Sequence, residues 1–203
     1  MGDVFIPGGE MSARHDDGNE ALIDVIGIDI LPFRTIRKSR APIVSAVNGI
    51  CQGGGLIIAM LSDIAVASDR ATFRAPETLR GIVDANLSAM LPAHVGIAHA
   101  RDLLMTGRRV GADEACRLGL VSRVVAHDDL RRATRDAVAE LLRAAPNARM
   151  QVKRLINARY GVIDEMSFEA SLLSDEVVEG FNAFTEKRTP NWVPEEFRSG
   201  DRL

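Results

Sequence analysis

Three consecutive glycines, Gly53–Gly55, lie between the apolar run "APIVSAVNG" and the aliphatic run "LIIAML". If a helix starts here, its first turn presents unpaired N–H groups and a partial positive charge. Glycines would let a ligand oxygen approach these donors closely. The chemistry offered is therefore a phosphate cradle or an oxyanion hole. A tight turn with close packing would use the same residues without any chemistry.

The sequence around the triplet separates these alternatives only in part. It contains neither GxGxxG nor GxxxxGK[ST], so the phosphate cradle has little support. An oxyanion hole needs only backbone N–H groups aimed at a developing negative charge. A tight turn is the commonest use of glycine, and the triplet alone favours it over the oxyanion hole.

The elements that must position this turn can be predicted from the apolar pattern. Residues 41–49 are β-branched and apolar without alternation, which is typical of a strand covered on both faces. We expect a buried helix over 55–63 and further strands over 64–68 and 71–77. A strand, a turn, a helix and a strand in this order predict an α/β fold.

The second part of the chain has helical spacing. A short helix with acidic residues in its first turn is expected after Gly111. Longer helices are expected over 130–145, where Pro146 stops the pattern, over 148–161 and over 167–188. We therefore divide the chain into an α/β core, residues 1–125, and a helical region, residues 126–203, that ends in a polar arm.

Composition excludes several classes of function. The chain has 203 residues, of which 46% are hydrophobic and 26% charged, as in ordinary globular proteins. Its net charge of −3 argues against nucleic-acid binding. Cys51, Cys116 and the histidines have no metal-ligand spacing, so no metal is expected. The start lacks the pattern of a signal peptide and no apolar run has membrane-spanning length, so a cytoplasmic protein without a membrane partner is expected.

Several motifs taken together resemble the enoyl-CoA hydratase/isomerase family, also called the crotonase family. They are "PIVSAVNG", "GGG", "SDIAVAS", the "F" and "PE" of "FRAPETLRG", "LLMTGRRVGADEACRLGLVSRVV" and "EGFNAFTEKRTPNW". The stretch "GDVFIPGGEMS" resembles the family's other oxyanion segment. These motifs extend over nearly the whole chain.

The resemblance implies a spiral of ββα units followed by a C-terminal helical trimerisation region. It also implies acyl-CoA thioester substrates, with no cofactor because coenzyme A is part of the substrate. The backbone N–H groups of Gly9 and Gly54 would hold the thioester oxygen as an enolate. Phe184 and Lys187 match residues that contact coenzyme A from a neighbouring subunit, although both could simply lie on an amphipathic helix face. The expected assembly is a homotrimer or a dimer of trimers.

The chain departs from the hydratase pattern at the acids. Ile57 stands where hydratases carry a glutamate two residues after the triplet, and an isoleucine cannot activate water. The family's other glutamate is present as Glu77. A carboxyl facing an apolar acyl pocket would have a raised pKa, which suits proton transfer. Ile57 would then contribute only to substrate binding.

The loop after Glu77 leaves one role open. It is one residue shorter than the Pro-Gly-x-Gly-Gly loop of hydratases, and Asp84 falls near a position where some isomerases carry a functional aspartate. Asp84 could share the proton transfer or could simply cap a helix. Both alternatives stand.

We therefore expect Glu77, with or without Asp84, to shift a double bond by proton transfer. Enoyl-CoA hydration is the alternative activity. A non-catalytic, oligomer-forming relative is the other alternative, because the chain has no counterpart of the two strands with which family members usually begin.

Overall fold

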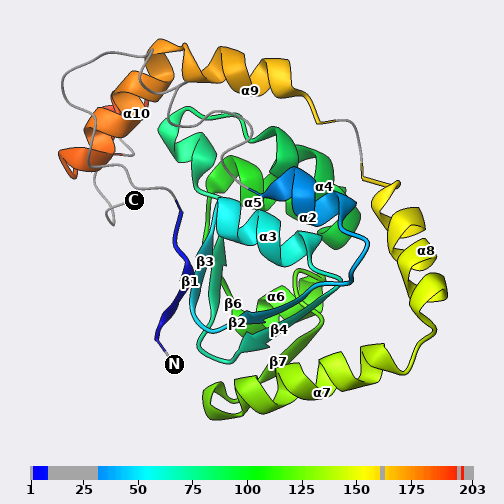
Figure 1. Cartoon of the computed structure of the whole chain (residues 1–203). Coiled ribbons are helices and arrows are strands. Elements are labelled where there is room, and N and C mark those ends of the chain that lie inside the picture. The colour runs from blue at the N-terminus through cyan, green and yellow to red at the C-terminus, as the bar shows by residue number, and fades with distance from the viewer. Residues whose placement is uncertain (1, 9–31, 161–162, 196–197, 199–203) are drawn as a thin grey trace.

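The computed structural model describes residues 2–8, 32–160, 163–195 and 198 (Figure 1). The strands are β1 (Val4–Ile6), β2 (Val44–Val47), β3 (Ile50–Gln52), β4 (Ile64–Ser68), β5 (Thr72–Arg74), β6 (Val110–Gly111) and β7 (Arg123–Val125). The helices are α2 (Phe33–Lys38), α3 (Gly54–Leu61), η1 (Glu77–Arg80), α4 (Ala85–Val95), α5 (Ile97–Thr106), α6 (Ala112–Leu118), η2 (His127–Asp129), α7 (Leu130–Leu142), α8 (Pro146–Asn157), α9 (Glu165–Leu172) and α10 (Asp175–Thr185).

The strands form two sheets, and the chain alternates between them. One sheet has the order β1-β3-β5-β6 and the other the order β2-β4-β7. The neighbours pair in parallel, except β5 and β6, which are antiparallel. The strand pairs β2–β3 and β4–β5 each place one strand in each sheet before the chain enters helices. This repeated ββα unit is the crotonase-like α/β spiral, as expected.

Apolar side chains on both sheets and on the inner helices make the main core. Its fully buried members include Val47 of β2, Phe73 of β5, Leu87 and Met90 of α4, and several residues of α3. The α3 sequence is hydrophobic on nearly all sides, which explains its burial among α2, α4 and the strands β1 and β3. This packing fixes the N-terminus of α3, where the glycines lie.

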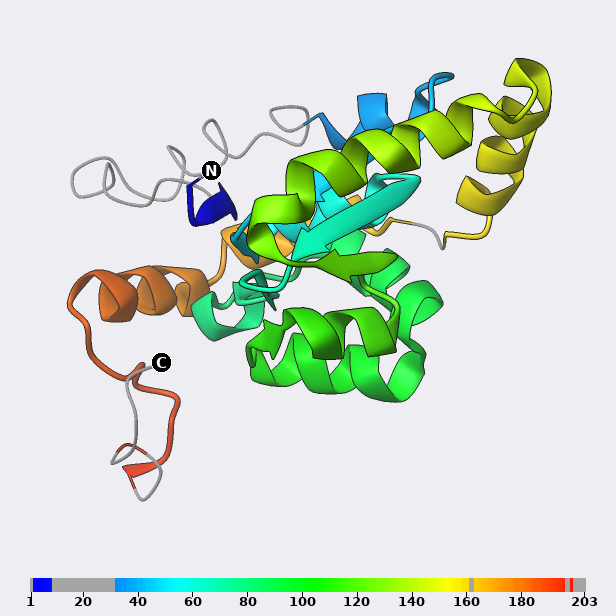
Figure 2. The same cartoon turned by 90° about the horizontal axis from the view of Figure 1, so that it is seen from below.

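The later helices run around the outside of the core (Figure 1). Helix α7 lies along β2 and β4, where Leu130 and Ala137 bury against Val66 (Figure 2). Helix α8 is attached by the buried amino group of Lys153, which donates to Asp63 at 2.7 Å. The division at residues 125 and 126, and a trimerisation role for the helices, remain predictions. No described helix is both long enough and apolar enough to cross a membrane.

The structure corrects three expected elements. Residues 50–52 form strand β3, whereas we expected the chain to turn directly into the helix. The expected helix over 167–188 is two helices, because Ser174 caps α10: its hydroxyl accepts from the backbone N–H of Val177 and donates to the carbonyl of Ser171. The expected helix over 130–145 ends earlier, at Leu142, and Pro146 is the first residue of α8.

Candidate functional site

The glycine triplet forms the start of α3. Gly53 is the N-cap residue with φ 53° and ψ −119°, a backbone conformation that is essentially restricted to glycine. Its N–H donates to the carbonyl of Arg74 at 3.1 Å, which ties the turn to β5. Gly54 is the first helical residue, so its N–H is among those with no acceptor inside the helix. The role of this N–H as an oxyanion donor remains a prediction.

Strand β1 comes very close to this turn. A Cβ atom on Gly55 would lie 2.4 Å from the carbonyl oxygen of Ile6, so only glycine allows the approach. Ile6 is three residues before Gly9, the other expected oxyanion donor. Gly9 itself lies outside the described residues, and its role remains a prediction.

The carboxyl group of Glu77 lies against the same turn. A Cβ atom on Gly53 would lie 2.3 Å from Oε1 of Glu77. Glu77 is the first residue of η1, directly after Pro76, and Thr78 fixes this short helix to α5 by donating to the carbonyl of Leu104 at 2.6 Å. The residue as a whole is partly exposed, but Oε2 is shut off from solvent and has no hydrogen-bond partner in the described part of the chain.

This setting makes Glu77 a weak acid. Burial raises the pKa of Glu77 to about 8, and the nearby negative charge of Asp84 also raises it. The backbone N–H of Glu77 itself and the charges of Arg80 and Arg74 act in the opposite direction. A shielded carboxyl with a pKa near neutrality can both take up and release a proton.

Asp84 is a helix cap as well as a neighbour of Glu77. Its Oδ1 accepts from the backbone N–H of Leu87 at 2.8 Å, so the expectation that it caps a helix, α4, is confirmed. Burial raises the pKa of Asp84, while the N–H groups of Leu87 and Asn86 lower it. The structure brings the two acids within electrostatic reach of each other, and a share for Asp84 in proton transfer remains a prediction.

Ile57 lies in the first turn of α3, where its N–H donates to the carbonyl of Gly53 at 3.1 Å. Its side chain is only 1% exposed and belongs to the main core. The position beside the turn is therefore filled by hydrocarbon, and it offers no group that could hold water. Its expected contact with substrate remains a prediction.

Comparison with known proteins decides the family. The family model described as enoyl-CoA hydratase/isomerase matches residues 3–195. The chain belongs to the enoyl-CoA hydratase/isomerase family. A carnitinyl-CoA dehydratase of Salmonella typhi is 35% identical over 165 residues, which are 74% of this chain and 62% of that protein. The chain thus spans about three fifths of the length of the curated relatives it matches.

Solved structures of family members agree with this fold. An enoyl-CoA hydratase/isomerase from Pseudoalteromonas atlantica T6c has a TM-score of 0.76 and 35% identity, covering 95% of this chain and 79% of that one. A monofunctional enoyl CoA isomerase from M. smegmatis has a TM-score of 0.58 and 32% identity, covering 70% of this chain and 66% of that one.

Two further residues that the family resemblance singled out lie at the end of α10. Phe184 is 49% exposed, and the guanidinium carbon of Arg80 lies 4.4 Å from the centre of its ring. Lys187 is exposed and has φ 54°, at the turn that leaves the helix. No interaction in the described part of the chain joins Phe184 or Lys187 to Glu77. Their contact with coenzyme A remains a prediction.

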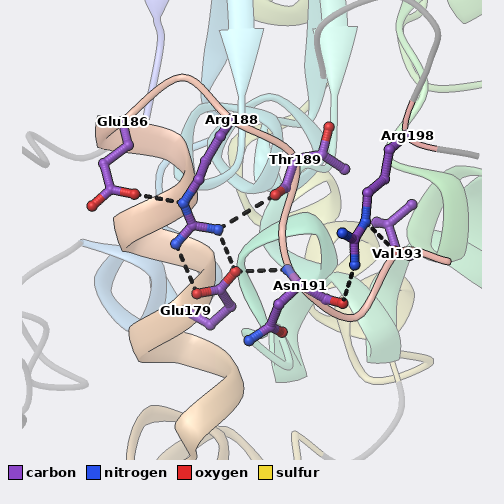
Figure 3. Close-up of polar contacts among 7 residues, drawn as sticks. All are labelled: Glu179, Glu186, Arg188, Thr189, Asn191, Val193 and Arg198. Carbon is purple, nitrogen blue, oxygen red and sulfur yellow. Dashed lines mark hydrogen bonds and ion pairs between the residues drawn. The ribbon is translucent and has the colours of Figure 1, made fainter. Parts of the chain in front are cut away.

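The arm after this turn is held back against α10. Arg188 binds both carboxylate oxygens of Glu179, and the backbone N–H of Asn191 donates to the same carboxylate at 2.6 Å (Figure 3). Arg198 then donates to the backbone carbonyls of Asn191 and Val193. These contacts fix the turn that carries Lys187.

Among the described residues, the Cys51 thiol and the possible metal ligands do not add a second reactive site. Cys51 is fully buried, and burial raises the pKa of its thiol to about 12, so it is a core residue rather than a nucleophile. In the described part of the chain, no group of three or more His, Cys, Asp or Glu side chains could hold a metal ion. No sequence pattern predicted the contact between Arg80 and Phe184, because these residues are more than a hundred positions apart.

Proposed function

We propose that this protein shifts a double bond in an acyl-CoA thioester, with Glu77 as the group that carries the proton. The observation that supports this most strongly is the solvent-shielded carboxyl of Glu77 packed directly against Gly53. An acid and a set of helix N-terminal N–H groups at one place can form an enolate and stabilise it.

The reaction would proceed through a dienolate. The Glu77 carboxylate removes a proton from C2 of a 3-enoyl-CoA, and the C–H electron pair extends into the thioester carbonyl. The backbone N–H groups of Gly9 and Gly54 hold the resulting oxyanion. Glu77 then returns the proton to C4, the electrons form the C2–C3 double bond, and the carboxylate is restored.

The raised pKa of Glu77 supports this role, since a base works best when its pKa lies near the operating pH. Asp84 would keep this pKa high and could share the proton. Ile57 leaves no side chain for activating water. Both features favour proton transfer over water addition.

Hydration or its reverse is the second candidate, because the curated relative from Salmonella typhi is named a dehydratase. The two candidates are separated by following a 3-enoyl-CoA and a 2-enoyl-CoA in parallel assays. We expect isomerisation to be the faster reaction in the wild type, and Ile57→Glu to raise the hydration rate. Efficient hydration by the wild type would overturn the proposal in favour of a hydratase.

We also propose that the protein assembles as a homotrimer or as a dimer of trimers. The late helices expose large apolar side chains of the kind that interfaces cover: Val152, Leu155, Ile156, Met166 and Leu173. In such an assembly, Phe184 and Lys187 would reach the coenzyme A of a neighbouring subunit. Light scattering should give at least three times the 22.0 kDa mass of one chain. A stable monomer at micromolar concentration would contradict this proposal.

A further inference from the structure

We propose that Arg80 is a positioning residue that joins the turn carrying Glu77 to α10 and holds a fixed positive charge near the Glu77 carboxyl. The proposal rests on the proposed function for its catalytic consequence, but its structural claim can be tested without activity.

Arg80 is the last residue of η1, the single turn that begins at Glu77. Its Nη1 donates to the carbonyl of Pro76 at 3.2 Å, so the guanidinium folds back over the turn. The guanidinium also stacks on the ring of Phe184 in α10, with 4.4 Å between Cζ and the ring centre. One side chain therefore connects both ends of η1 with the C-terminal helix.

Helix α10 is built to come this close. A Cβ on Gly180 would lie 2.6 Å from the backbone of Arg80, and a Cβ on Gly81 would lie 2.6 Å from the backbone of Glu176. Both positions therefore require glycine. The backbones of η1 and α10 touch, and Arg80 lies at the contact.

Two further contacts extend this interface toward Asp84. Ile82 buries against Leu172, Val177 and Phe181 of α9 and α10. The backbone N–H of Val83 donates to the hydroxyl of Ser171 at 3.0 Å. The stretch between the two acids is thus held by the C-terminal helices along its length.

The charge of Arg80 is costly at this place. Its Nε is buried and has no hydrogen-bond partner in the described part of the chain. A guanidinium left partly unsatisfied destabilises the fold compared with an apolar side chain of similar shape. A methionine could cover Phe184, but it would lose the cation–π contact and the positive charge. The same cation acts on Glu77, whose pKa its charge lowers.

Three charged groups of the described residues shift the pKa of Glu77. Asp84 raises the pKa of Glu77, whereas Arg80 and Arg74 lower it. The positive charges of Arg109 and Arg80 lower the pKa of Arg74. On α10, Glu179 is bound to Arg188. Without Arg80, Arg74 is the one cation in the described part of the chain that lowers the pKa of Glu77 against the effect of Asp84.

The test measures the titration of Glu77 directly, by carbon-13 NMR of glutamate side chains, with its signal assigned from Glu77→Gln. In Arg80→Met we expect the midpoint to rise by about one pH unit, the lower end of the effect of a neighbouring opposite charge. Arg80→Lys should bring most of the shift back because it keeps the charge. Arg131→Met, which removes a charge from the exposed face of α7, is the matched control.

An unchanged midpoint in Arg80→Met, or an equal shift in Arg131→Met, would overturn the proposal. If Arg80→Met does not fold, Arg80→Gln is measured in its place, with the same expectation. Where the protein isomerises 3-enoyl-CoA, the acid limb of kcat/KM should move together with the NMR midpoint. A shifted midpoint in a protein without isomerase activity would sustain the role of Arg80 and reject the proposed function.

Discussion

Oε1 of Glu77 occupies the space that a side chain on Gly53 would fill, 2.3 Å from the position of that Cβ. The Glu77 carboxyl and the glycine turn are thereby packed against each other, although they are 24 positions apart in the sequence.

Gly53→Ala should therefore displace the Glu77 carboxyl as well as strain the backbone. The strain at φ 53° alone should cost about 1–3 kcal/mol of unfolding free energy. Gly96→Ala is the matched control, since Gly96 has φ 77° but open space where its Cβ would lie. Urea denaturation should show both variants destabilised, whereas only Gly53→Ala should lose activity. Full activity in Gly53→Ala would show that the contact is unimportant.

The raised pKa of Glu77 predicts a pH-dependent stability. The folded protein holds the Glu77 proton up to about pH 8, whereas the unfolded chain releases it near 4.5. The stabilisation from this proton is fully present below about 4.5 and is lost as the pH rises toward 8. Glu77→Gln has no such proton to lose, so its free energy of unfolding relative to wild type should increase between pH 5 and 8.

The control for this measurement is Glu179→Gln. Interaction with Arg188 lowers the pKa of Glu179 to about 2, so its contribution is complete above pH 5. Its difference from wild type should therefore be constant between pH 5 and 8. A constant difference for Glu77→Gln as well would mean that Glu77 titrates normally.

Asp84 can be tested as a cap and as a charge separately. Asp84→Asn keeps a capping oxygen for Leu87, so the stability should be nearly unchanged while the pKa of Glu77 falls. Asp84→Ala should lose about 0.5–2 kcal/mol of unfolding free energy with the cap. Asp164→Asn, at the exposed cap of α9, should leave the pKa of Glu77 unchanged. A Glu77 pKa that stays the same in Asp84→Asn would contradict the proposed coupling of the acids.

Local patterns predicted the parts of the fold that depend on local sequence. The bounds of β4 agree with the prediction because Ile64–Ser68 is an unbroken run of apolar or small residues, all but the first of which are buried. Strand β3 was missed because Ile50–Gln52 is too short to show a pattern, and parallel pairing with β1 and β5 makes it a strand. The break between α9 and α10 depends on one cap, Ser174, inside an otherwise helical pattern.

The sequence predicted some residues of the candidate site and missed others. The family motif pointed to Glu77 and to the glycine turn, and the structure brings them into contact. The motif could not decide whether Asp84 caps a helix or shares the proton transfer. The loop after Glu77 is one residue shorter than in hydratases, and this shift changes which family position Asp84 matches. The stacking of Arg80 on Phe184 joins segments that are distant in the sequence, so no local pattern could reveal it.

The central claim is that Glu77 carries the proton, and the most direct test is the isomerisation of a 3-enoyl-CoA by Glu77→Gln. Glutamine keeps the shape of the side chain but cannot take up and return a proton. The account predicts that kcat/KM falls by about 10²–10⁴-fold, the usual contribution of general acid–base catalysis. Glu169→Gln, at an exposed glutamate of α9, should keep the wild-type rate. A Glu77→Gln variant that isomerises as fast as the wild type would contradict the account.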